Sequence, residues 1–456
     1  MDDRTRNRIL AVLFVGVLMG ALDAAIVGPA LPALQGDFGV QERSLSWILT
    51  IYVLCALLST PLMAKLADRA GRRSIYVLDV ALFGLGSLVV ALSPTFAMLL
   101  IGRAIQGIGA GGVFPIAAAV IGDTFPPEKR GRALGLIGAV FGLAFILGPL
   151  LGGMLLKYSW HLLFYINLPI AVVLIIAAFR VLPTTRPAQA SPFDWAGLSV
   201  LTLLLILLTL GLNQLGGAEI RLWPLILALG GIGLLPVFAA VEAGAADPII
   251  RPKIFSSQQM LMGSLLAIGS GMCMVSVSFL PSLITASFPV DVSAASFMLM
   301  PLILTLMVGS PIVGRLVDRI GSKLVLLGGS VLLIVGLLTL SLGSLTLVSF
   351  YAATLLMGLG LSALLGAPIR YIVMNATHAA ERTSAQGAIS VFTGIGQILC
   401  SALIGSIAGS FGGGAAGYQA GYLFVSIITV IMLAASLRLK DRAAEVEAFG
   451  NNAKIS

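Results

Sequence analysis

Residues 64–78 of this chain read AKLADRAGRRSIYVL, and residues 314–328 read GRLVDRIGSKLVLLG. The two segments lie 250 residues apart and agree at positions that carry charge or glycine. The matched pairs are Asp68 with Asp318, Arg69 with Arg319, Gly71 with Gly321, and Arg73 with Lys323. One such segment could arise by chance, but two copies at one offset indicate an internal repeat. The chain is therefore predicted to consist of two related halves.

The composition indicates that both halves lie in a membrane. Of the 456 residues, 58% are hydrophobic and 10% are charged, whereas roughly a quarter are charged in an average soluble protein. The apolar residues form runs of about twenty or more, long enough for a helix to cross a hydrocarbon core of about 30 Å. The net charge of +8 would suggest nucleic acid for a soluble protein, but here basic residues are expected to mark one side of the bilayer. We therefore expect the lipid bilayer as a partner and no nucleic acid.

We predict an all-α integral membrane protein with fourteen transmembrane helices. Two pseudo-symmetric bundles of six helices occupy residues 1–182 and 259–456, the second with a tail, and residues 183–258 form a linker with two additional central helices. The expected spans are 9–34, 45–65, 75–93, 96–122, 132–156, 162–182, 195–214, 222–241, 260–286, 293–314, 323–343, 346–374, 384–410 and 419–439.

The distribution of Lys and Arg tests this topology, because positive residues collect in short cytoplasmic loops. If the first residue is cytoplasmic, 22 of the 27 basic residues fall on the cytoplasmic side and two, Arg103 and Arg370, fall within spans. The other side holds only Arg43, Lys157 and Arg221. With an odd number of spans, loops rich in Lys and Arg and loops poor in them would fall on the same side of the membrane. The separation therefore predicts an even number of spans with both termini cytoplasmic.

Several segments resemble the signatures of one transporter family. The repeated loop resembles the G-x-L-A-D-R-x-G-R-R signature of the major facilitator superfamily, with Ala64 in place of the first Gly. Three segments resemble signatures of its drug:proton antiporter branch, namely LDAAIVGPALP at 22–32, GRAIQGIGAGG at 102–112 and GAVFGLAFILGPLLGG at 138–153. SWHLLFYINLPI at 159–170 is similar to the W-R-W-I-F-L-I-N-V-P-I segment of the fourteen-span branch, from which His161 and Leu162 depart. The resemblance implies two parallel six-helix repeats with a substrate path between them near the bilayer midplane.

The repeated loop is a candidate cytoplasmic gate. An acid beside a helix N-terminus is favoured by the helix dipole, and arginines can reach carboxylates or helix C-termini across the bundle interface. The residues of this candidate gate are Asp68, Arg69, Gly71, Arg72, Arg73, Asp318, Arg319 and Gly321. The alternative is that the basic residues are ordinary anchors on the cytoplasmic side.

The segment 138–153 is unusually rich in glycine, which is unfavourable within a helix by up to about 1 kcal/mol relative to alanine. In a membrane, glycines permit close helix packing, and a proline can bend the span. The residues singled out for this antiporter-type span are Gly142, Gly148, Pro149, Gly152 and Gly153. The corresponding stretch of the second half, from Gly394, keeps glycines but lacks the proline. Tight packing without a directional role remains the alternative.

Four charged residues are expected inside the membrane, where each isolated charge costs at least about 2.5 to 3.5 kcal/mol. Asp23 lies in the middle of the first span, Arg103 in the fourth, Arg370 in the twelfth, and Asp79 near the cytoplasmic start of the third. Arg370 is a candidate to hold an anionic substrate group or to exchange partners with Asp23, or it is structural. Asp79 is a candidate for coupling, although an ion pair with a loop arginine is the commoner arrangement for such a residue.

We hypothesise that Asp23 carries the coupled proton and that Arg103 is its partner. Burial favours the neutral acid and a neighbouring arginine favours the anion, so the two effects compete. The family resemblance implies the same roles, because the acid of the first span and the arginine of the fourth are associated with coupling there. A permanent structural ion pair is the alternative.

No nucleotide-binding loop, metal-ligand cluster or catalytic triad is recognisable in the sequence. We therefore expect no cofactor, no enzymatic activity and no ATP-driven pumping. The leading interpretation is a monomeric multi-pass protein of the cell membrane that exports hydrophobic or cationic small molecules in exchange for protons by alternating access. An exporter of a lipid or a metabolite is the first alternative, and a membrane sensor that transports nothing is the second.

Overall fold

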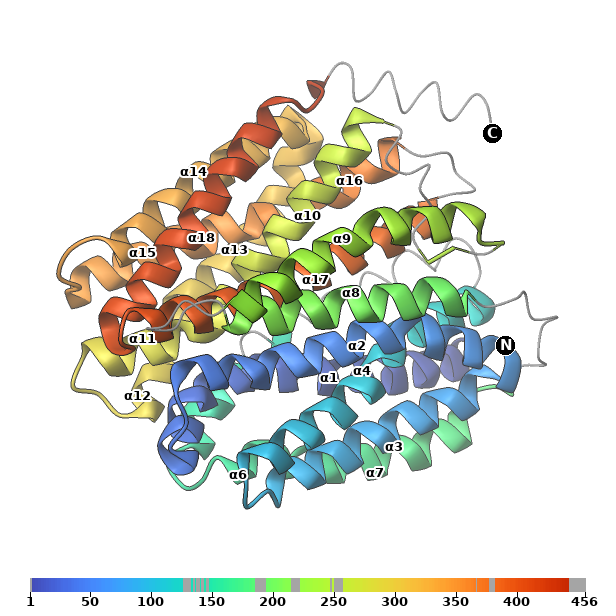
Figure 1. Cartoon of the computed structure of the whole chain (residues 1–456). Coiled ribbons are helices and arrows are strands. Elements are labelled where there is room, and N and C mark those ends of the chain that lie inside the picture. Colours follow the sequence, from blue (N-terminus) through green and yellow to red (C-terminus); the bar gives the residue numbers. More distant parts are fainter. Residues whose placement is uncertain are drawn as a thin grey trace. The chain divides into compact units, whose positions relative to one another are not determined.

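A computed structural model gives the structure of the chain (Figure 1) and describes residues 2–125, 133, 136, 140, 143–144, 147–184, 194–214, 222–246, 248–249, 257–365, 367–376 and 382–442. For 65, 68, 122, 318, 367, 374–376 and 382–387 it describes the backbone only. Within these ranges the chain consists of helices and connecting turns, without a strand. The prediction of an all-α protein is therefore confirmed.

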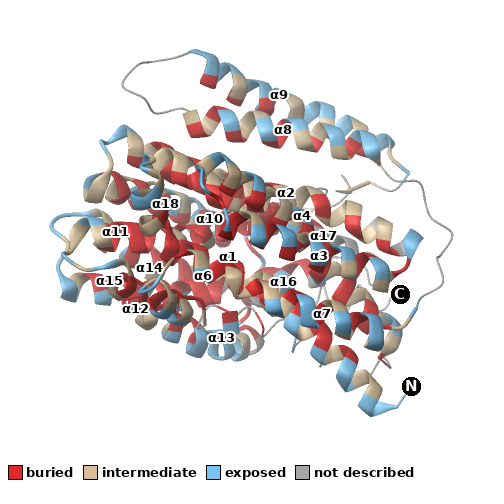
Figure 2. Cartoon of the chain, turned by 90° about the horizontal axis from the view of Figure 1, so that it is seen from below, coloured by how far each residue is buried: buried red, intermediate tan, exposed pale blue. Residues whose placement is uncertain are grey.

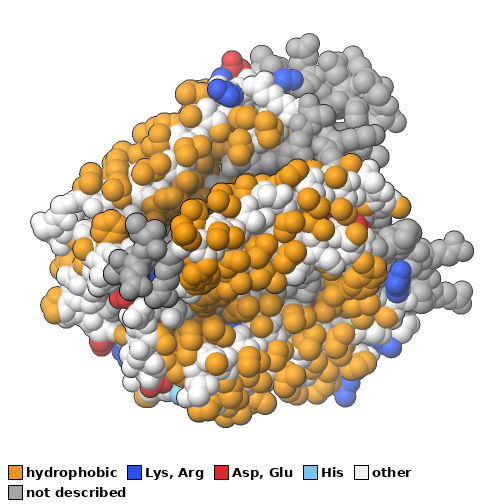
Figure 3. Space-filling view, in the orientation of Figure 1, with side chains coloured by type: hydrophobic (Ala, Val, Ile, Leu, Met, Phe, Trp, Pro, Cys, Tyr) orange, Lys and Arg blue, Asp and Glu red, His pale blue; other side chains and the backbone are white. Residues whose placement is uncertain are grey.

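The helices are those of a membrane protein. Thirteen segments of the described residues are long and apolar enough to span a membrane. The fifth expected span, 132–156, falls largely outside the described residues, which there include the helical stretch 147–155. Many large apolar side chains are exposed, and Figure 3 shows them covering most of the visible face, with few charged side chains between them. A surface of this kind is stable in lipid rather than in water.

The chain consists of two compact units. Unit 1 comprises residues 1–40, 47–193 and 290–297, and unit 2 comprises residues 41–46, 194–289 and 298–456. The helices of unit 1 are α1 (Asp3–Phe38), α2 (Glu42–Ala70, from Trp47 on), α3 (Arg72–Ala91), α4 (Phe96–Thr124), α6 (His161–Tyr165), α7 (Asn167–Val181) and α12 (Val292–Phe297). Those of unit 2 are α8 (Trp195–Gln214), α9 (Leu222–Gly244), α10 (Gln258–Ser276), the short 3-10 helix η2 (Val277–Phe279), α11 (Leu280–Ser287), α13 (Met300–Ile320), α14 (Ser322–Ser341), α15 (Leu347–Leu365), α16 (Ala367–Ala376), α17 (Arg382–Ser410) and α18 (Gly414–Leu437).

Some expected spans are made of more than one helix, and proline explains two of the interruptions. Pro281 stands in the first turn of α11, and Pro301 stands in the first turn of α13. Proline has no backbone N–H, so it fits the first turn of a helix but interrupts a helix that approaches it from the N-terminal side. The spans expected at 260–286 and 293–314 are therefore broken where these prolines begin a new helix.

The internal repeat is also visible in the backbone. Helices α3 and α14 are both 20 residues long, and each follows the glycine of the repeated loop. Gly71 has a φ of 90° and Gly321 a φ of 86°. Residues with a side chain rarely adopt such angles, so both copies of the loop need glycine at this position. The same offset of 250 residues thus relates both the motif and the helix that it introduces.

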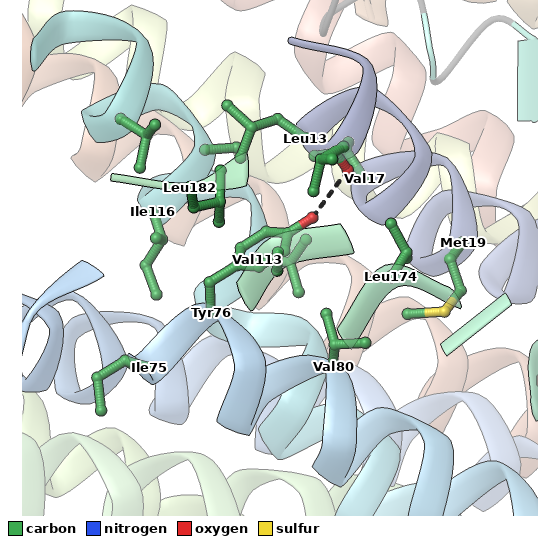
Figure 4. Packing of buried hydrophobic residues seen from close by; sticks show 14 of the residues in the cluster. Leu13, Val17, Met19, Ile75, Tyr76, Val80, Val113, Ile116, Leu174 and Leu182 are labelled. Carbon is green, nitrogen blue, oxygen red and sulfur yellow. Dashed lines mark hydrogen bonds between the residues drawn. The ribbon is translucent and has the colours of Figure 1, made fainter. Parts of the chain in front are cut away.

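The core of unit 1 is formed where α3 packs against α1, α4 and α7. Tyr76 of α3 is fully buried, and its hydroxyl donates to the backbone oxygen of Val12 in α1 at 3.1 Å. Figure 4 shows the tyrosine reaching α1 beside Leu13 and Val17, among aliphatic side chains of the neighbouring helices. This hydrogen bond satisfies a polar group that would be costly to bury unpaired in a membrane protein.

The two additional helices, α8 and α9, pack closely on each other within unit 2. A Cβ on Gly211 of α8 would lie 2.5 Å from the backbone nitrogen of Ala228 in α9, so glycine allows the two backbones to approach. Figure 2 shows the pair with α9 largely exposed. The first turn of α2 also belongs to unit 2. Asn213, near the end of α8, donates to Oγ of Ser46 in this turn at 2.7 Å.

Candidate functional site

A buried ion pair joins α1 and α4 inside unit 1. Nη1 of Arg103 lies 2.5 Å from Oδ2 of Asp23, and neither side chain is accessible to solvent. Nε of Arg103 donates to the backbone oxygen of Ile48 in α2 at 3.1 Å, and the guanidinium carbon lies 4.2 Å from the ring centre of Tyr52. The structure thus brings together the two residues that the sequence singled out as partners.

Two amides and a hydroxyl complete this site. Gln106 of α4 donates to Oδ1 of Asp23 at 3.0 Å and to Oγ of Ser87 in α3 at 2.7 Å, while its own oxygen accepts from Arg103 at 2.8 Å. Asn167 of α7 donates to Oδ1 of Asp23 and to Oγ of Ser87, both at 3.2 Å. We call these five buried residues, which come from four helices, the Asp23 cluster.

Close packing of α3 on α4 positions the cluster. A Cβ on Gly86 would lie 2.5 Å from the backbone nitrogen of Gln106, and a Cβ on Gly102 would lie 2.6 Å from Cγ2 of Val90. Because these positions carry no side chain, the two backbones approach closely enough for Ser87 to meet Gln106.

Asn167 reaches the cluster from the start of α7. Asn167 is the first residue of α7, directly after the interruption that separates α7 from the short helix α6. From this position at the start of α7, the side-chain amide of Asn167 donates to Asp23 and Ser87.

The hydrogen bonds of the cluster satisfy both carboxylate oxygens of Asp23, and two other polar atoms have no partner among the described residues. The carboxylate accepts from a guanidinium and two amides, which together compensate its charge. In contrast, Nη2 of Arg103 and Oδ1 of Asn167 have no hydrogen-bond partner among the described residues. The cluster can therefore offer one more donor and one more acceptor to a water molecule or to a polar group of a substrate.

Sequence reasoning missed three members of this cluster. Gln106 lies three residues after Arg103, a spacing that places both on one face of a helix, and a buried amide there could have been noticed. Asn167 lies in the quoted segment 159–170, which was used only to identify the branch. Ser87 carries no recognisable signal, because serine is common in membrane helices.

The antiporter-type span contributes close packing to unit 1. Three of its glycines approach a neighbouring helix so closely that a Cβ would collide. The contacts are Gly148 with Ala25 Cβ at 2.6 Å, Gly152 with Pro29 Cβ at 2.9 Å, and Gly153 with the Phe297 ring at 2.6 Å. Pro149 is buried between them, and Gly142 lies outside the described residues. The first two contacts are made with α1 shortly after Asp23, so this span supports the helix that carries the acid.

The arginines of the first repeated loop bind helix ends within unit 1. Arg72 forms an ion pair with Asp123 and donates to the backbone oxygen of Ala119, both in the last turns of α4. Arg73 donates to the backbone oxygen of Phe179 near the end of α7 at 3.4 Å. The sequence predicted such contacts across the interface of the two bundles, whereas these contacts join helices of one bundle. The reason is that the C-terminal turns of α4 and α7, where the helix dipole is negative, lie beside the loop.

The other residues of the candidate gate have fewer contacts that the structure describes. Arg69 and Arg319 are exposed in the last turns of α2 and α13, where a positive charge favours the helix dipole. In the second repeat, Lys323 forms an ion pair with Asp441 at 2.9 Å. The side chains of Asp68 and Asp318 lie outside the described residues.

The two remaining intramembrane charges lie in different units. Arg370 lies in α16 of unit 2 with an exposed side chain. Asp79 lies in α3 of unit 1 and is fully buried, yet both of its carboxylate oxygens lack a hydrogen-bond partner among the described residues. The ion pair with a loop arginine, expected as the commoner arrangement, is therefore not formed there.

Comparisons with known proteins agree with this architecture. The family model of the Major Facilitator Superfamily matches residues 13–280 and 260–454. The chain is 34% identical over 420 residues to "Uncharacterized MFS-type transporter YfiU" of Bacillus subtilis, covering 88% of this chain and 80% of that protein. It is 33% identical over 324 residues to "Multidrug resistance protein 3" of the same organism, covering 69% of this chain and 62% of that protein.

A solved structure shares the fold at low sequence identity. It is the inward-facing structure of a bacterial homologue of the human lysosomal transporter Spinster, with a TM-score of 0.70 and 16% identity, covering 99% of both chains. The family match extends over nearly the whole sequence and includes both copies of the repeat. The chain therefore belongs to the Major Facilitator Superfamily and is a multi-pass membrane transporter.

Proposed function

We propose that this transporter is a proton-coupled exporter of hydrophobic or cationic small molecules, of the fourteen-span drug:proton antiporter branch. The observation that carries the proposal is the Asp23 cluster. Its acid is buried, ion-paired with Arg103 and reached by two amides, and Arg103 and Asn167 each keep one polar atom without a hydrogen-bond partner among the described residues. Such a site can exchange a proton for another cation.

The chemistry of the site suggests how exchange would occur. When Asp23 is ionised, it neutralises Arg103 and holds Gln106 and Asn167 in place. When Asp23 takes up a proton, Arg103 loses its counter-ion, and the hydrogen bonds of the cluster must rearrange. A cationic substrate competes with the proton for the same negative charge. Protonation and substrate binding then exclude each other, which is the requirement for antiport.

Two further observations support export of this class of substrate. One relative bears the name "Multidrug resistance protein 3", and the segment 138–153 has the Gly-Pro pattern of the antiporter branch. Its glycines pack tightly on α1, the helix that carries Asp23. We extend the proposal to the cell membrane as location, with both termini in the cytoplasm, the repeated loops as a cytoplasmic gate, and a monomer as the working form.

The proposal also covers the organisation of the chain and the role of Arg370. We propose that residues 1–182 and 259–456 act as the two bundles of alternating access and that residues 183–258 connect them. Arg370 has an exposed side chain in α16, which suits a residue that meets an anionic substrate group.

Reconstitution of the full chain into liposomes tests the function. With an imposed pH gradient, addition of ethidium or another lipophilic cation is expected to release protons from the wild-type protein. Asp23→Asn should abolish this proton movement, because asparagine keeps the shape but carries no exchangeable proton. Asp291→Asn, at an exposed position outside the cluster, is the matched control and should behave as wild type.

Three results would contradict the proposal. Proton-driven transport by Asp23→Asn at the wild-type rate would exclude Asp23 as the carrier. Movement of a fluorescent lipid or a metabolite, without movement of any cation tested, would favour the lipid or metabolite exporter instead. Absence of proton movement with every lipophilic cation tested would contradict proton coupling itself.

A further inference from the structure

Among the described residues of unit 1, Asp79 is the only fully buried charged side chain outside the Asp23 cluster. It lies on α3, two helical turns before Ser87, which corresponds to about 12 Å along the helix axis. Both of its carboxylate oxygens lack a hydrogen-bond partner among the described residues. The two acids of this unit thus occupy opposite environments, because Asp23 accepts from a guanidinium and two amides.

The space for the Asp79 carboxyl is provided by a glycine on α4. A Cβ on Gly112 would lie 2.7 Å from Cγ of Asp79 and 2.7 Å from Cβ of Met63 in α2, and would also collide with Oδ2 of the acid. The carboxyl group therefore lies where a side chain at position 112 would otherwise stand, next to Met63 of α2. Glycine at this position makes room for an acid but offers it no hydrogen-bond donor from a side chain.

No cation compensates Asp79 among the described residues that surround it. The titratable side chain beside it is Tyr76, whose hydroxyl donates to the backbone oxygen of Val12. Gly112 of α4 and Met63 of α2, which meet beside its carboxyl group, carry no charge. Of the two loop arginines nearest in sequence, Arg72 forms an ion pair with Asp123 and Arg73 donates to the backbone oxygen of Phe179.

An ionised carboxylate in this position would be a buried charge without a counter-ion in the part of the chain that the structure describes. Such a charge is avoided in proteins by protonation of the group. Two acids of one protein can take different protonation states when their environments differ. The contrast between Asp79 and Asp23 fits this pattern.

We propose that Asp79 is a second proton-binding site of this transporter, which holds its proton as a neutral carboxylic acid while Asp23 is the ionised partner of Arg103. The inference rests on the proposed proton coupling and deepens it, because it assigns two exchangeable protons to one bundle. Proton uptake and release at Asp79 require only that water reach the contact of α2, α3 and α4 in another conformation of the cycle. No covalent step is involved, and the proton is exchanged with water.

The protonation state is tested by infrared difference spectroscopy on the purified full-length protein at neutral pH. The wild type should show the band of a protonated carboxyl group, and Asp79→Asn should lack it. Asp291→Asn removes an exposed acid instead and should keep the band. An unchanged band in Asp79→Asn would show that Asp79 is ionised and would overturn the proposal.

The coupling role is tested in liposomes with ethidium as the probe. Asp79→Asn mimics the protonated acid in shape and is expected to fold, which a monodisperse elution profile checks. Asp79→Ser serves as a smaller second variant. Both should still transport ethidium but move half as many protons per ethidium as the wild type, because one of two proton sites is lost.

The outcomes separate this inference from the proposed function. A wild-type ratio and pH profile in both variants would make Asp79 a structural neutral acid and would overturn its coupling role, while leaving Asp23 as the carrier. If the wild type itself moves no protons with ethidium or other lipophilic cations, the proposed function fails and the coupling role fails with it. The infrared experiment would then still show whether Asp79 holds a proton.

Discussion

Nη1 of Arg103 in α4 contacts Oδ2 of Asp23 in α1 at 2.5 Å, 80 residues away in sequence and shielded from solvent on all sides. The same nitrogen also donates to Gln106, and Nε donates to the backbone oxygen of Ile48. One guanidinium therefore joins three helices through donors arranged in one plane. This geometry cannot be reproduced by a lysine, whose single ammonium group carries the same charge on a flexible chain.

We expect Arg103→Lys to impair transport although it preserves the charge. The substitution loses the bond to Ile48 and at least one of the two bonds made by Nη1. Hydrogen bonds that involve a charged group contribute about 1.5 to 3 kcal/mol, so proton-driven ethidium transport should fall by about tenfold or more. Arg4→Lys, at an exposed position near the start of α1, is the matched control. A wild-type rate for Arg103→Lys would mean that charge alone matters at this position.

Asn167→Ala is expected to weaken coupling, because it removes the donor to Oδ1 of Asp23 and to Oγ of Ser87. Asn213→Ala provides the comparison, since Asn213 is equally buried but bonds Ser46 outside the cluster. Hydrogen bonds between membrane helices contribute about 0.6 kcal/mol on average, so both variants should lose similar stability in thermal unfolding. Only Asn167→Ala should lower the number of protons moved per ethidium. Equal proton ratios in the two variants would show that Asn167 is merely structural.

Gly86→Ala is expected to separate α3 from α4 at the cluster. Its Cβ would lie 2.5 Å from the backbone nitrogen of Gln106, and backbone atoms cannot move aside as a flexible side chain can. Overpacking of this kind costs about 1 to 3 kcal/mol, so both the unfolding temperature and transport should fall. Gly20→Ala in α1 is the control, because nothing lies within 4 Å of its Cβ position. Similar melting temperatures for the two variants would contradict the close packing of α3 on α4.

Gly71→Ala and Gly321→Ala are expected to destabilise the protein to a similar extent. The two glycines have φ angles of 90° and 86°, and a side chain in a sparsely populated backbone conformation costs about 1 to 3 kcal/mol. Gly328→Ala in α14 should be neutral or stabilising, because its Cβ position is open and alanine favours a helix. Thermal unfolding of the three variants in detergent measures the difference. A loss confined to one of the two loops would contradict their structural equivalence.

The sequence predicted the membrane fold because its main signals are local. The length and apolarity of the runs depend only on residues that follow one another, and lipid leaves the helix as the main way to satisfy the backbone. The repeated loop was equally readable, since a motif at a constant offset needs no knowledge of contacts. Pro281 and Pro301 are local signals for a helix break as well. The spans were nevertheless predicted as unbroken, because they were defined by length and apolarity alone.

The sequence by itself determined that Asp23 and Arg103 lie in membrane helices, and the cost of a buried charge made them candidate partners. Only the tertiary structure placed Gln106, Asn167 and Ser87 around them, because these contacts depend on how α3, α4 and α7 pack together. It likewise directed Arg72 to the end of its own bundle and left Asp79 without a described partner. An acid buried in a membrane needs either a counter-ion or a proton. The side chains of the helices that face the acid decide which of the two it receives.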